Sequence, residues 1–417
     1  MSNVVPGGWA IKTVGELSSV KRGASPRPIK DARWWGGNVG WVRISDVTSS
    51  NKYLKKTTQY LSAEGVSKSV KINKGEVVLS ICATIGRPII VSVDACIHDG
   101  FVWFDKLSQS IDREFWYYFL TSKEEYFSSQ RQSGTQGNLN TAIVSDLNCL
   151  LPALSEQKKI AAILTSVDEV IEKTQAQIDK LKDLKTAMMQ ELLTCGVGVD
   201  GKPHTEFKDS PVGRIPKGWE VVRISQLCSH IVDCVNKTAP VVDYSTPYKM
   251  IRTTNVRHGR VDTVNVRNVT KETYEAWTRR LLPMNGDLIF TREAPVGECG
   301  ILEDSRGVFL GQRTMMYRAD NEKTSSLFLM YSLMSEYGKQ QLEDFSGGST
   351  VPHMRVPDCE KILIKLPSLG EQKKIIDSLK SVDNLIQIKE TKSTSLQNTK
   401  KALMQDLLTG KVRVKVD

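Results

Sequence analysis

The sequence lacks the usual features of membrane, secreted and metal-binding proteins. It has no run of about 18 consecutive apolar residues, so no segment is expected to span a membrane. Its first residues, MSNVVPGGWAIKTVGEL, have no basic start followed by an apolar core, so no secretory signal is expected. None of the eight cysteines forms a CxxC motif, and the five histidines lack metal-ligand spacing. These absences predict a cytoplasmic protein with reduced thiols and no bound metal.

The motifs of common catalytic sites are also absent. The chain has no GxxxxGK[ST] phosphate loop, no HExxH and no Asn-Pro-Pro-aromatic methyltransferase loop. Gly196–Gly201 matches GxGxxG, but it follows a predicted helix instead of a strand, and Gly196 more simply ends that helix. Pro357–Lys361 resembles a nuclease carboxylate–lysine site, yet its acidic residues crowd into one short turn. We therefore expect a non-catalytic chain that carries no cofactor of its own.

A long internal repeat dominates what is present. Leu151–Val199 aligns without a gap to Leu366–Val414, and 23 of the 49 aligned positions are identical. Apolar residues recur in both copies at spacings of three and four, which predicts two long helices that form an antiparallel coiled coil. The predicted seam residues are Ile160, Leu164, Val167, Ile171, Ile178, Leu181, Met188, Leu192, Ile375, Leu379, Val382, Ile386, Leu396, Leu403 and Leu407.

Polar residues interrupt both seams. Thr174 and Lys185 break the first copy, and Lys389, Ser393 and Lys400 break the second. Because the second copy is more interrupted, we expect its helix to leave part of its surface for a partner protein.

The positive charge lies mainly outside the repeat. The formal net charge is +10, while Glu156–Thr194 and Glu371–Thr409 together carry about +1. The remaining segments therefore hold a surplus of about +9, and they are the candidates for contact with phosphate.

Short apolar runs separated by Gly, Pro, Asn and Ser predict a β-rich domain before each repeat copy. In the first half these runs are Val39–Ile44, Glu76–Ile81, Arg87–Val93 and Phe101–Phe104, and one amphipathic helix is predicted at Asp112–Tyr126.

The second half repeats this pattern in a diverged form. Trp9 and Trp219 match, as do Gly75 and Gly286, so the duplication covers the domain and its helix. The predicted boundaries are residues 1–150 for the first domain, 151–195 for its helix, 196–217 for a linker, 218–365 for the second domain and 366–417 for the second helix and tail.

Loops of both domains are rich in side chains that contact DNA. Arg and Lys suit phosphate and guanine, whereas Asn and Gln suit adenine. Each residue also has the plainer interpretation of a solvated loop side chain. Positions that differ between equivalent loops are where different bases would be read, while the matched Arg43 and Arg252 suit a phosphate grip or a strand brace. The candidates are Arg22, Ser25, Arg27, Lys30, Arg33, Arg43, Arg87, Gln136, Asn138, Asn236, Lys237, Arg252, Asn255, Arg257, Arg292, Arg313, His353 and Arg355.

The repeated motif resembles a known family. LPxLxEQKKI followed by a heptad helix that ends in MQxLLT, present twice after two diverged domains, is similar to the specificity subunit of type I restriction–modification enzymes. Ile251–Arg260 and Phe290–Leu302 also resemble segments of that family's domains.

The resemblance implies an α+β fold in which two β-rich target recognition domains are separated by the two helices, with pseudo-twofold duplication. Each domain would read one half of a bipartite double-stranded DNA site, and the helices would set the unread gap. It further implies two modification subunits that methylate adenine with S-adenosylmethionine, and restriction subunits with helicase and nuclease activity. The alternative is a structural adaptor that spaces two protein-binding domains without binding DNA.

Overall fold

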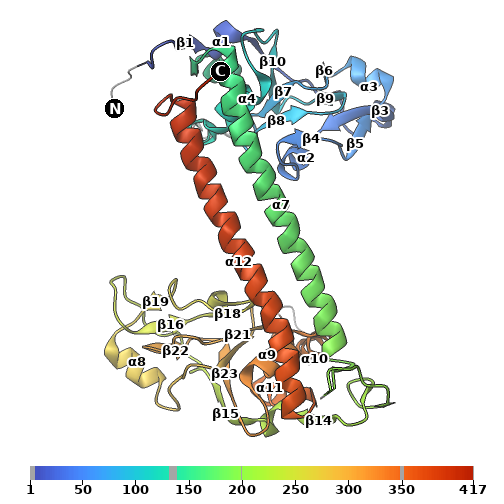
Figure 1. Ribbon diagram of the computed structural model, residues 1–417, viewed down its shortest axis with the longest axis vertical. Helices are drawn as coiled ribbons and strands as arrows, with labels where there is room; N and C mark the ends of the chain where they lie inside the picture. Colours follow the sequence, from blue (N-terminus) through green and yellow to red (C-terminus); the bar gives the residue numbers. More distant parts are fainter. Residues whose placement is uncertain (1–4, 131–138, 199, 348–351, 417) are drawn as a thin grey trace. The chain divides into compact units, whose positions relative to one another are not determined.

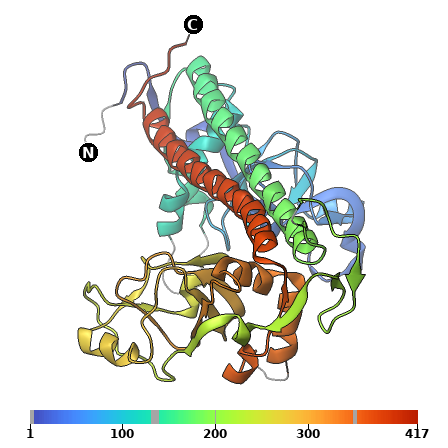
Figure 2. The ribbon, with the colours of Figure 1, turned by 60° about the horizontal axis from the view of Figure 1, so that its bottom comes forward.

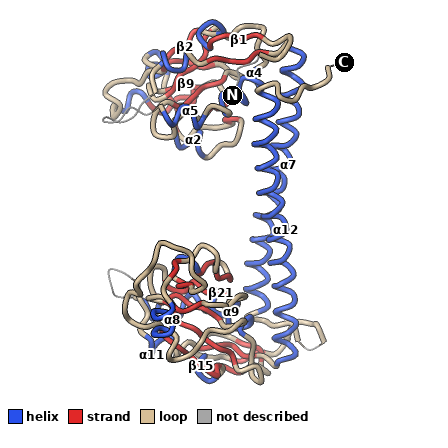
Figure 3. The backbone as a smooth tube through the Cα atoms, turned by 90° about the vertical axis from the view of Figure 1, so that its left-hand side faces the viewer, coloured by secondary structure: helices blue, strands red, loops and turns tan. Residues whose placement is uncertain are grey.

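The computed structural model describes residues 5–130, 139–198, 200–347 and 352–416 of the chain. Two compact units are present: unit 1 combines residues 1–176 with 391–417, and unit 2 spans residues 177–390. Each unit contains a β-rich lobe and half of each of two long helices (Figure 3). The first lobe ends at Leu151, and the second lobe lies between residues 200 and 366.

The long helices are α7 (Leu154–Leu192) and α12 (Leu369–Leu408). Their halves lie side by side within each unit (Figures 1 and 2). In unit 1, Asp168 of α7 forms an ion pair with Lys400 of α12. In unit 2, Lys185 of α7 pairs with Asp383 of α12. Going from Asp168 to Lys185 along α7, the partner on α12 moves back from Lys400 to Asp383. The helices therefore run antiparallel, and the predicted coiled coil is confirmed.

The predicted seam side chains are all withdrawn from solvent to some extent. Eight of them are buried: Ile160, Leu164, Ile178, Ile375, Leu379, Val382, Ile386 and Leu407. The other seven are half-buried: Val167, Ile171, Leu181, Met188, Leu192, Leu396 and Leu403.

Two of the three polar residues that interrupt the second seam contact the first helix, while Leu385 and Ile388 on α12 are 46% and 61% exposed, so the surface expected for a partner stays a prediction. Lys389 donates a hydrogen bond to Gln177 of α7, Lys400 pairs with Asp168, and Ser393 is 6% exposed. A long lysine side chain can bury its stem along a helix and still place its ammonium on a polar partner. Lys389 and Lys400 therefore contact the first helix, and Ser393 is buried.

Two sheets form the first lobe, with η1 (Ala32–Trp34), α2 (Ile44–Thr48) and α3 (Ala63–Ser67) in the connections. The first sheet has the order β2 (Ser19–Arg22), β10 (Phe101–Asp105), β7 (Val77–Ser80), β8 (Pro88–Val91), β4 (Tyr53–Leu54). The second sheet has the order β5 (Gln59–Leu61), β3 (Trp35–Val42), β9 (Ala95–Ile97), β6 (Val70–Ile72). The strands predicted from the four apolar runs are therefore confirmed as β3, β7, β8 and β10.

The predicted helix at Asp112–Tyr126 is two helices, α4 (Arg113–Thr121) and α5 (Glu124–Ser129). Asp112 caps α4 by accepting a hydrogen bond from the backbone N–H of Phe115. Phe127 of α5 lies against the turn between β7 and β8, where a Cβ on Gly86 would be only 2.8 Å from the Cβ of Phe127. The predicted region is therefore helical, but it is divided between Thr121 and Glu124.

The second lobe repeats the arrangement. Its larger sheet has the order β15 (Cys228–Asp233), β23 (Thr314–Ala319), β20 (Leu288–Arg292), β21 (Val296–Ile301), β18 (Gly259–Val261), β17 (Val256–Arg257). Its smaller sheet has the order β19 (Arg267–Asn268), β16 (Lys249–Ile251), β22 (Val308–Leu310). The helical segments are η2 (Ile224–Gln226), η3 (Thr253–Asn255), α8 (Lys271–Trp277), α9 (Ser326–Met334), α10 (Glu336–Ser346) and α11 (Val356–Cys359).

Each lobe is closed by a two-stranded sheet next to its long helix. In unit 1, β1 (Ala10–Thr13) pairs with β11 (Asn148–Leu151), and the short helices α1 (Val14–Leu17) and α6 (Thr141–Ser145) lie beside it. In unit 2, β14 (Glu220–Arg223) pairs with β24 (Leu363–Leu366). The segment predicted as a linker carries its own hairpin of β12 (Phe207–Lys208) and β13 (Ile215–Pro216).

The repeated Glu-Gln pair joins each lobe to a helix. In unit 1, the indole N–H of Trp9 donates to Glu156 over 3.1 Å. In unit 2, the indole of Trp219 donates to Glu371 over 3.0 Å. The neighbouring Gln157 donates to the carbonyls of Ser110 and Pro152, and Gln372 donates to those of Lys323 and Pro367. The repeat is therefore strongest where helix and lobe are fastened together.

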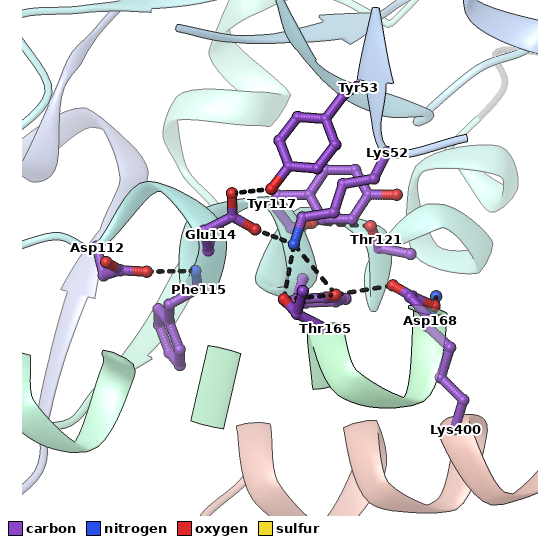
Figure 4. A network of polar contacts seen from close by, with 11 residues as sticks. Lys52, Tyr53, Asp112, Glu114, Phe115, Tyr117, Thr121, Thr165, Asp168 and Lys400 are labelled. Carbon is purple, nitrogen blue, oxygen red and sulfur yellow. Dashed lines mark hydrogen bonds and ion pairs between the residues drawn. The ribbon is translucent and has the colours of Figure 1, made fainter. Parts of the chain in front are cut away.

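A buried lysine adds a second connection in unit 1 (Figure 4). Lys52, which precedes β4, is 4% exposed, and its ammonium contacts Glu114 of α4 and donates to Thr165 of α7 over 2.8 Å. Burial lowers the pKa of Lys52 to about 8, although the negative charge of Asp168 opposes this shift. No helix in the described part of the chain is long and apolar enough to cross a membrane.

Candidate nucleic-acid interface

Four loop segments meet at one end of the larger sheet in the first lobe. The backbone N–H of Ala24, after β2, donates to the carbonyl of Ile97 over 3.1 Å. Ile81, after β7, donates to Gly100 in the β9–β10 turn over 2.8 Å, and Leu139 donates to Ile81 over 3.1 Å. Loops held on a rigid sheet edge are a common place for binding residues.

Two glycines allow this close approach. A Cβ on Gly100 would lie 2.3 Å from the Sγ of Cys82, and one on Gly23 would lie 2.2 Å from the carbonyl oxygen of His98. Any other residue at these positions would push the loops apart.

The second lobe builds the same edge. The N–H of Cys234, after β15, donates to the carbonyl of Thr314 over 3.1 Å. Arg292 donates through its backbone N–H to Arg313 over 2.9 Å, and Met354 donates to Arg292 over 2.9 Å. Arg313 has φ of 73°, so this turn adopts a conformation that a non-glycine residue rarely takes.

Polar side chains of these loops hold one another in the first lobe. The hydroxyl of Ser25 donates to the carboxylate of Asp99 over 2.7 Å, and Arg27 lies 3.3 Å from the other carboxylate oxygen. Arg22 donates to the backbone carbonyl of Asp99. The hydrogen bond from Ser25, reinforced by the charge of Arg27 and opposed by partial burial, lowers the pKa of Asp99. Asp99 is therefore anionic at neutral pH.

The second lobe uses a different set at the same place. The guanidinium of Arg292 donates to Asp233 over 3.0 Å and to the carbonyl of Met354 over 3.0 Å. Arg313 pairs with Glu293 over 3.1 Å. The two lobes therefore share the backbone contacts at this edge but differ in the side chains that the edge carries.

Arg43 and Arg252 stand beside these edges in both lobes. Arg43 follows β3, whose Val42 pairs with Ile97 of β9, and Arg252 follows β16, whose Ile251 pairs with Leu310 of β22. Both arginines therefore lie next to the turn that carries the differing residues. Arg43 is exposed and Arg252 is half-buried.

Comparisons with known proteins decide the family. A family model described as "Type I restriction modification DNA specificity domain" matches residues 6–183 and 216–398. The specificity subunit of the type I restriction enzyme MjaVIII from Methanocaldococcus jannaschii is 30% identical over 427 residues, which cover 99% of this chain and 94% of that protein. The chain belongs to the type I restriction–modification specificity family.

More distant members of the family agree. The specificity subunit of the Escherichia coli enzyme EcoBI is 21% identical, and the match covers 81% of this chain and 72% of that protein. The crystal structure of a type I restriction–modification S subunit from M. genitalium superposes with a TM-score of 0.58 at 12% identity, with 98% of each chain covered. The fold of this chain is therefore that of the specificity family.

The structure places the predicted DNA-binding residues in three groups. Six are exposed and form no ion pair with another described residue: Lys30, Arg43, Asn236, Lys237, Arg257 and His353. Five are exposed arginines held by an acidic residue or a carbonyl: Arg22, Arg27, Arg33, Arg313 and Arg355. Ser25, Arg87, Arg252 and Arg292 are half-buried, and Asn255 is buried. Gln136 and Asn138 lie outside the described residues.

The more buried candidates act inside the lobes. Arg87 donates to the carbonyl of Ser50, and the amide of Asn255 accepts from the N–H of Arg252 and donates to the carbonyl of Asn265. By contrast, sequence reasoning did not select Asp99 as a site residue, because a single carboxylate gives no DNA-binding signal. Aligning the two lobes at the β9–β10 and β22–β23 turns would have placed Asp99 opposite Gln312. Among the described residues, no cluster of three or more His, Cys, Asp or Glu could hold a metal ion.

Proposed function

We propose that this chain is the sequence-specific DNA recognition subunit of a type I restriction–modification complex. Each lobe reads one half of a bipartite double-stranded DNA site, and partner subunits methylate adenine and cleave the DNA. The observation that carries the proposal is the pair of equivalent loop edges, whose backbone contacts match while their polar side chains differ. Such an arrangement suits one scaffold that reads two different sequences.

The charge distribution supports the same function. The surplus of about +9 lies outside the long helices, and Arg43 and Arg252 occupy equivalent exposed or half-exposed positions beside the loop edges. Phosphate contacts of this kind supply most of the affinity of DNA-binding proteins and make it steeply dependent on salt.

The partner subunits complete the chemistry. Two similar modification subunits fit the duplicated form of the chain, because a pseudo-twofold scaffold presents equivalent docking surfaces. S-adenosylmethionine binds to these modification subunits, and restriction subunits join the complex.

Exchange of one lobe tests the proposal. The first lobe is replaced by that of a relative with a different target, and the hybrid is assembled with the modification subunits. Sequencing of methylated adenines should show one changed half-site and one unchanged half-site. A change in both halves would contradict independent reading. A chain that only spaces partner proteins would give no salt-dependent binding of plasmid DNA by the assembled complex.

A second experiment tests whether the helices set the gap between half-sites. Lys389 and Gln177 contact each other, so four residues inserted after Gln177 and four inserted before Lys389 lengthen α7 and α12 by about one turn while keeping their partners aligned. One turn is about 5.4 Å, or roughly one to two base pairs of DNA. The methylated motif should keep both half-sites and gain a longer spacer. An unchanged spacer would show that the helices do not measure the gap.

A further inference from the structure

The turn between β9 and β10 in the first lobe has an exact counterpart between β22 and β23 in the second. Ile81 donates to the carbonyl of Gly100 over 2.8 Å, and Arg292 donates to the carbonyl of Arg313 over 2.9 Å. The residue before each acceptor is Asp99 in the first lobe and Gln312 in the second. The backbone contacts therefore place Asp99 and Gln312 at equivalent positions.

A hydroxyl side chain orients each of these two residues. Ser25, from the loop after β2, donates to Asp99 over 2.7 Å. Thr238, from the slightly longer loop after β15, donates to Gln312 over 3.2 Å. The same hydrogen bond is thus made from the same loop to the same position, although both partners have changed. Such a contact fixes the side chain; the second carboxylate oxygen of Asp99 also accepts from Arg27, and each carboxylate oxygen keeps a further lone pair.

Asp99 and Gln312 are both accessible to solvent, and they offer different hydrogen-bonding chemistry. The side chain of Asp99 is 43% exposed, and as an anion it only accepts hydrogen bonds. Gln312 is exposed, and its amide both donates and accepts. A carboxylate accepts from the N4 amino group of cytosine, whereas a glutamine amide matches N6 and N7 of adenine.

DNA phosphates repel a carboxylate, so an anion at an edge that faces DNA requires nearby positive charge. Arg22 at the end of β2 and Arg27 in the loop after it contact Asp99 and offset its charge, and Arg43, which follows β3, flanks the turn. The first lobe therefore keeps the anion in a cationic setting, which suits a side chain that accepts from a base and not one that binds phosphate.

We propose that Asp99 and Gln312 determine the specificity of the two lobes, with Asp99 reading a cytosine in one half-site and Gln312 reading an adenine in the other. Ser25 and Thr238 are positioning residues that aim them. This inference rests on the proposed DNA-recognition function and assigns it to particular side chains.

The test uses Asp99→Asn and Gln312→Glu in the full chain, assembled with its modification subunits. Sequencing of methylated adenines should show that Asp99→Asn changes the accepted base at one position of one half-site and leaves the other half-site intact. Gln312→Glu should do the converse. A lost base contact should reduce discrimination at that position by roughly tenfold or more. The unaltered half-site reports that the variant is folded.

Matched controls keep the interpretation sharp. Asp94→Asn changes an exposed carboxylate at the opposite end of β9, and Gln226→Glu changes an exposed glutamine of η2, so both should leave the motif unchanged. Ser25→Ala should weaken discrimination at the same base position as Asp99→Asn.

Each other outcome overturns a specific statement. If the variants methylate the parent motif with unchanged discrimination, Asp99 and Gln312 do not read bases, while the proposed function stands. If Asp99→Asn weakens binding to all sequences equally, Asp99 only braces Arg22 and Arg27. If the parent complex neither binds nor methylates a defined sequence, the proposed function fails and this inference falls with it.

Discussion

The two units make one contact identically and a neighbouring contact differently. In each unit a tyrosine of the lobe donates to an aspartate of one long helix over 2.7 Å, and a lysine of the other helix pairs with the same aspartate over 2.6 Å. The residues are Tyr118, Asp168 and Lys400 in unit 1, and Tyr331, Asp383 and Lys185 in unit 2. This contact survived while most of the surrounding lobe sequence diverged.

The difference lies one step away, at Lys52. Tyr53 of β4 pairs with Ile90 in the first lobe, and Arg260 of β18 pairs with Ile301 at the equivalent position of the second lobe. The residue before each is Lys52 and Gly259, so Gly259 is the equivalent of Lys52. Gly259 has φ of 85°, a conformation that would strain a lysine. The first lobe is thus fastened by a buried cation that the second lobe does not have at this position. The comparison teaches that the attachment of lobe to helix has a common part and a lobe-specific part.

The largest expected effect is a pH dependence of the free energy of unfolding that Lys52 causes. The pKa of Lys52 is lowered in the folded chain to about 8, so above this pH the unfolded state binds more protons at this site than the folded state does. Its contribution to the free energy of unfolding should therefore rise between pH 8 and the ordinary lysine pKa, by up to roughly 3 kcal/mol.

Denaturant unfolding of the parent chain and Lys52→Met across pH 7 to 10.5 measures this contribution. The stability of the parent relative to the variant should be constant near pH 7 and should increase above pH 8. A decrease above pH 8 would mean that the ion pair with Glu114 outweighs the cost of burial.

Removing the shared aspartate should cost more in unit 1. Asp168→Asn leaves Lys400 unpaired and also removes a negative charge that favours the ammonium of Lys52, whereas Asp383→Asn leaves only Lys185 unpaired. These pairs are partly buried, so we expect losses of about 2 kcal/mol for Asp168→Asn and about 1 kcal/mol for Asp383→Asn, between the surface and buried limits. Thermal and denaturant unfolding measure both losses. If the two variants lose the same stability, Lys52 is not coupled to Asp168.

Glu156 and Glu371, which join each lobe to a long helix, also differ between the two units in their hydrogen-bond donors. Glu156 accepts from Trp9 and from the guanidinium of Arg413 in the C-terminal tail. Glu371 accepts from Trp219, from His204 and from two backbone N–H groups.

Removing one donor therefore leaves the two carboxylates in different states. Arg413→Met leaves Glu156 with the indole alone, whereas His204→Phe leaves Glu371 with three donors. A buried carboxylate that loses a donor is destabilised by the desolvation it can no longer offset. The melting temperature should fall more for Arg413→Met than for His204→Phe, and the reverse order would contradict this explanation.

The long helices could be predicted from sequence because their signal is local and repeated. Ile160 and Leu164, or Ile375 and Leu379, stand at heptad spacing on one helix face, and two copies in register exclude chance. The short strands were also within reach, because buried runs such as Val77–Ser80 are bounded by turn residues. Local pattern and burial agree in these segments.

Other features depend on contacts between residues far apart in the chain. Lys52 gave no signal, because a lysine is expected in solvent unless its partners Glu114 and Thr165 are already placed beside it. Likewise, the spacing did not show that Lys400, which interrupts the seam of α12, is paired with Asp168 of α7. Which polar residue finds a partner is decided by tertiary packing, which spacing alone does not describe.

The smallest expected effect comes from an exposed ion pair between the two helices in unit 2. Lys182 pairs with Glu390 over 3.0 Å in unit 2, but their side chains are 54% and 47% exposed. Solvent and salt screen such a pair, so Lys182→Ala should change the free energy of unfolding by less than about 0.5 kcal/mol. Lys185→Ala, only three residues along α7, removes a lysine that is 14% exposed and paired with Asp383, and it should cost several times more. If both variants lose the same stability in denaturant unfolding, the burial of an ion pair does not determine how much it stabilises this protein.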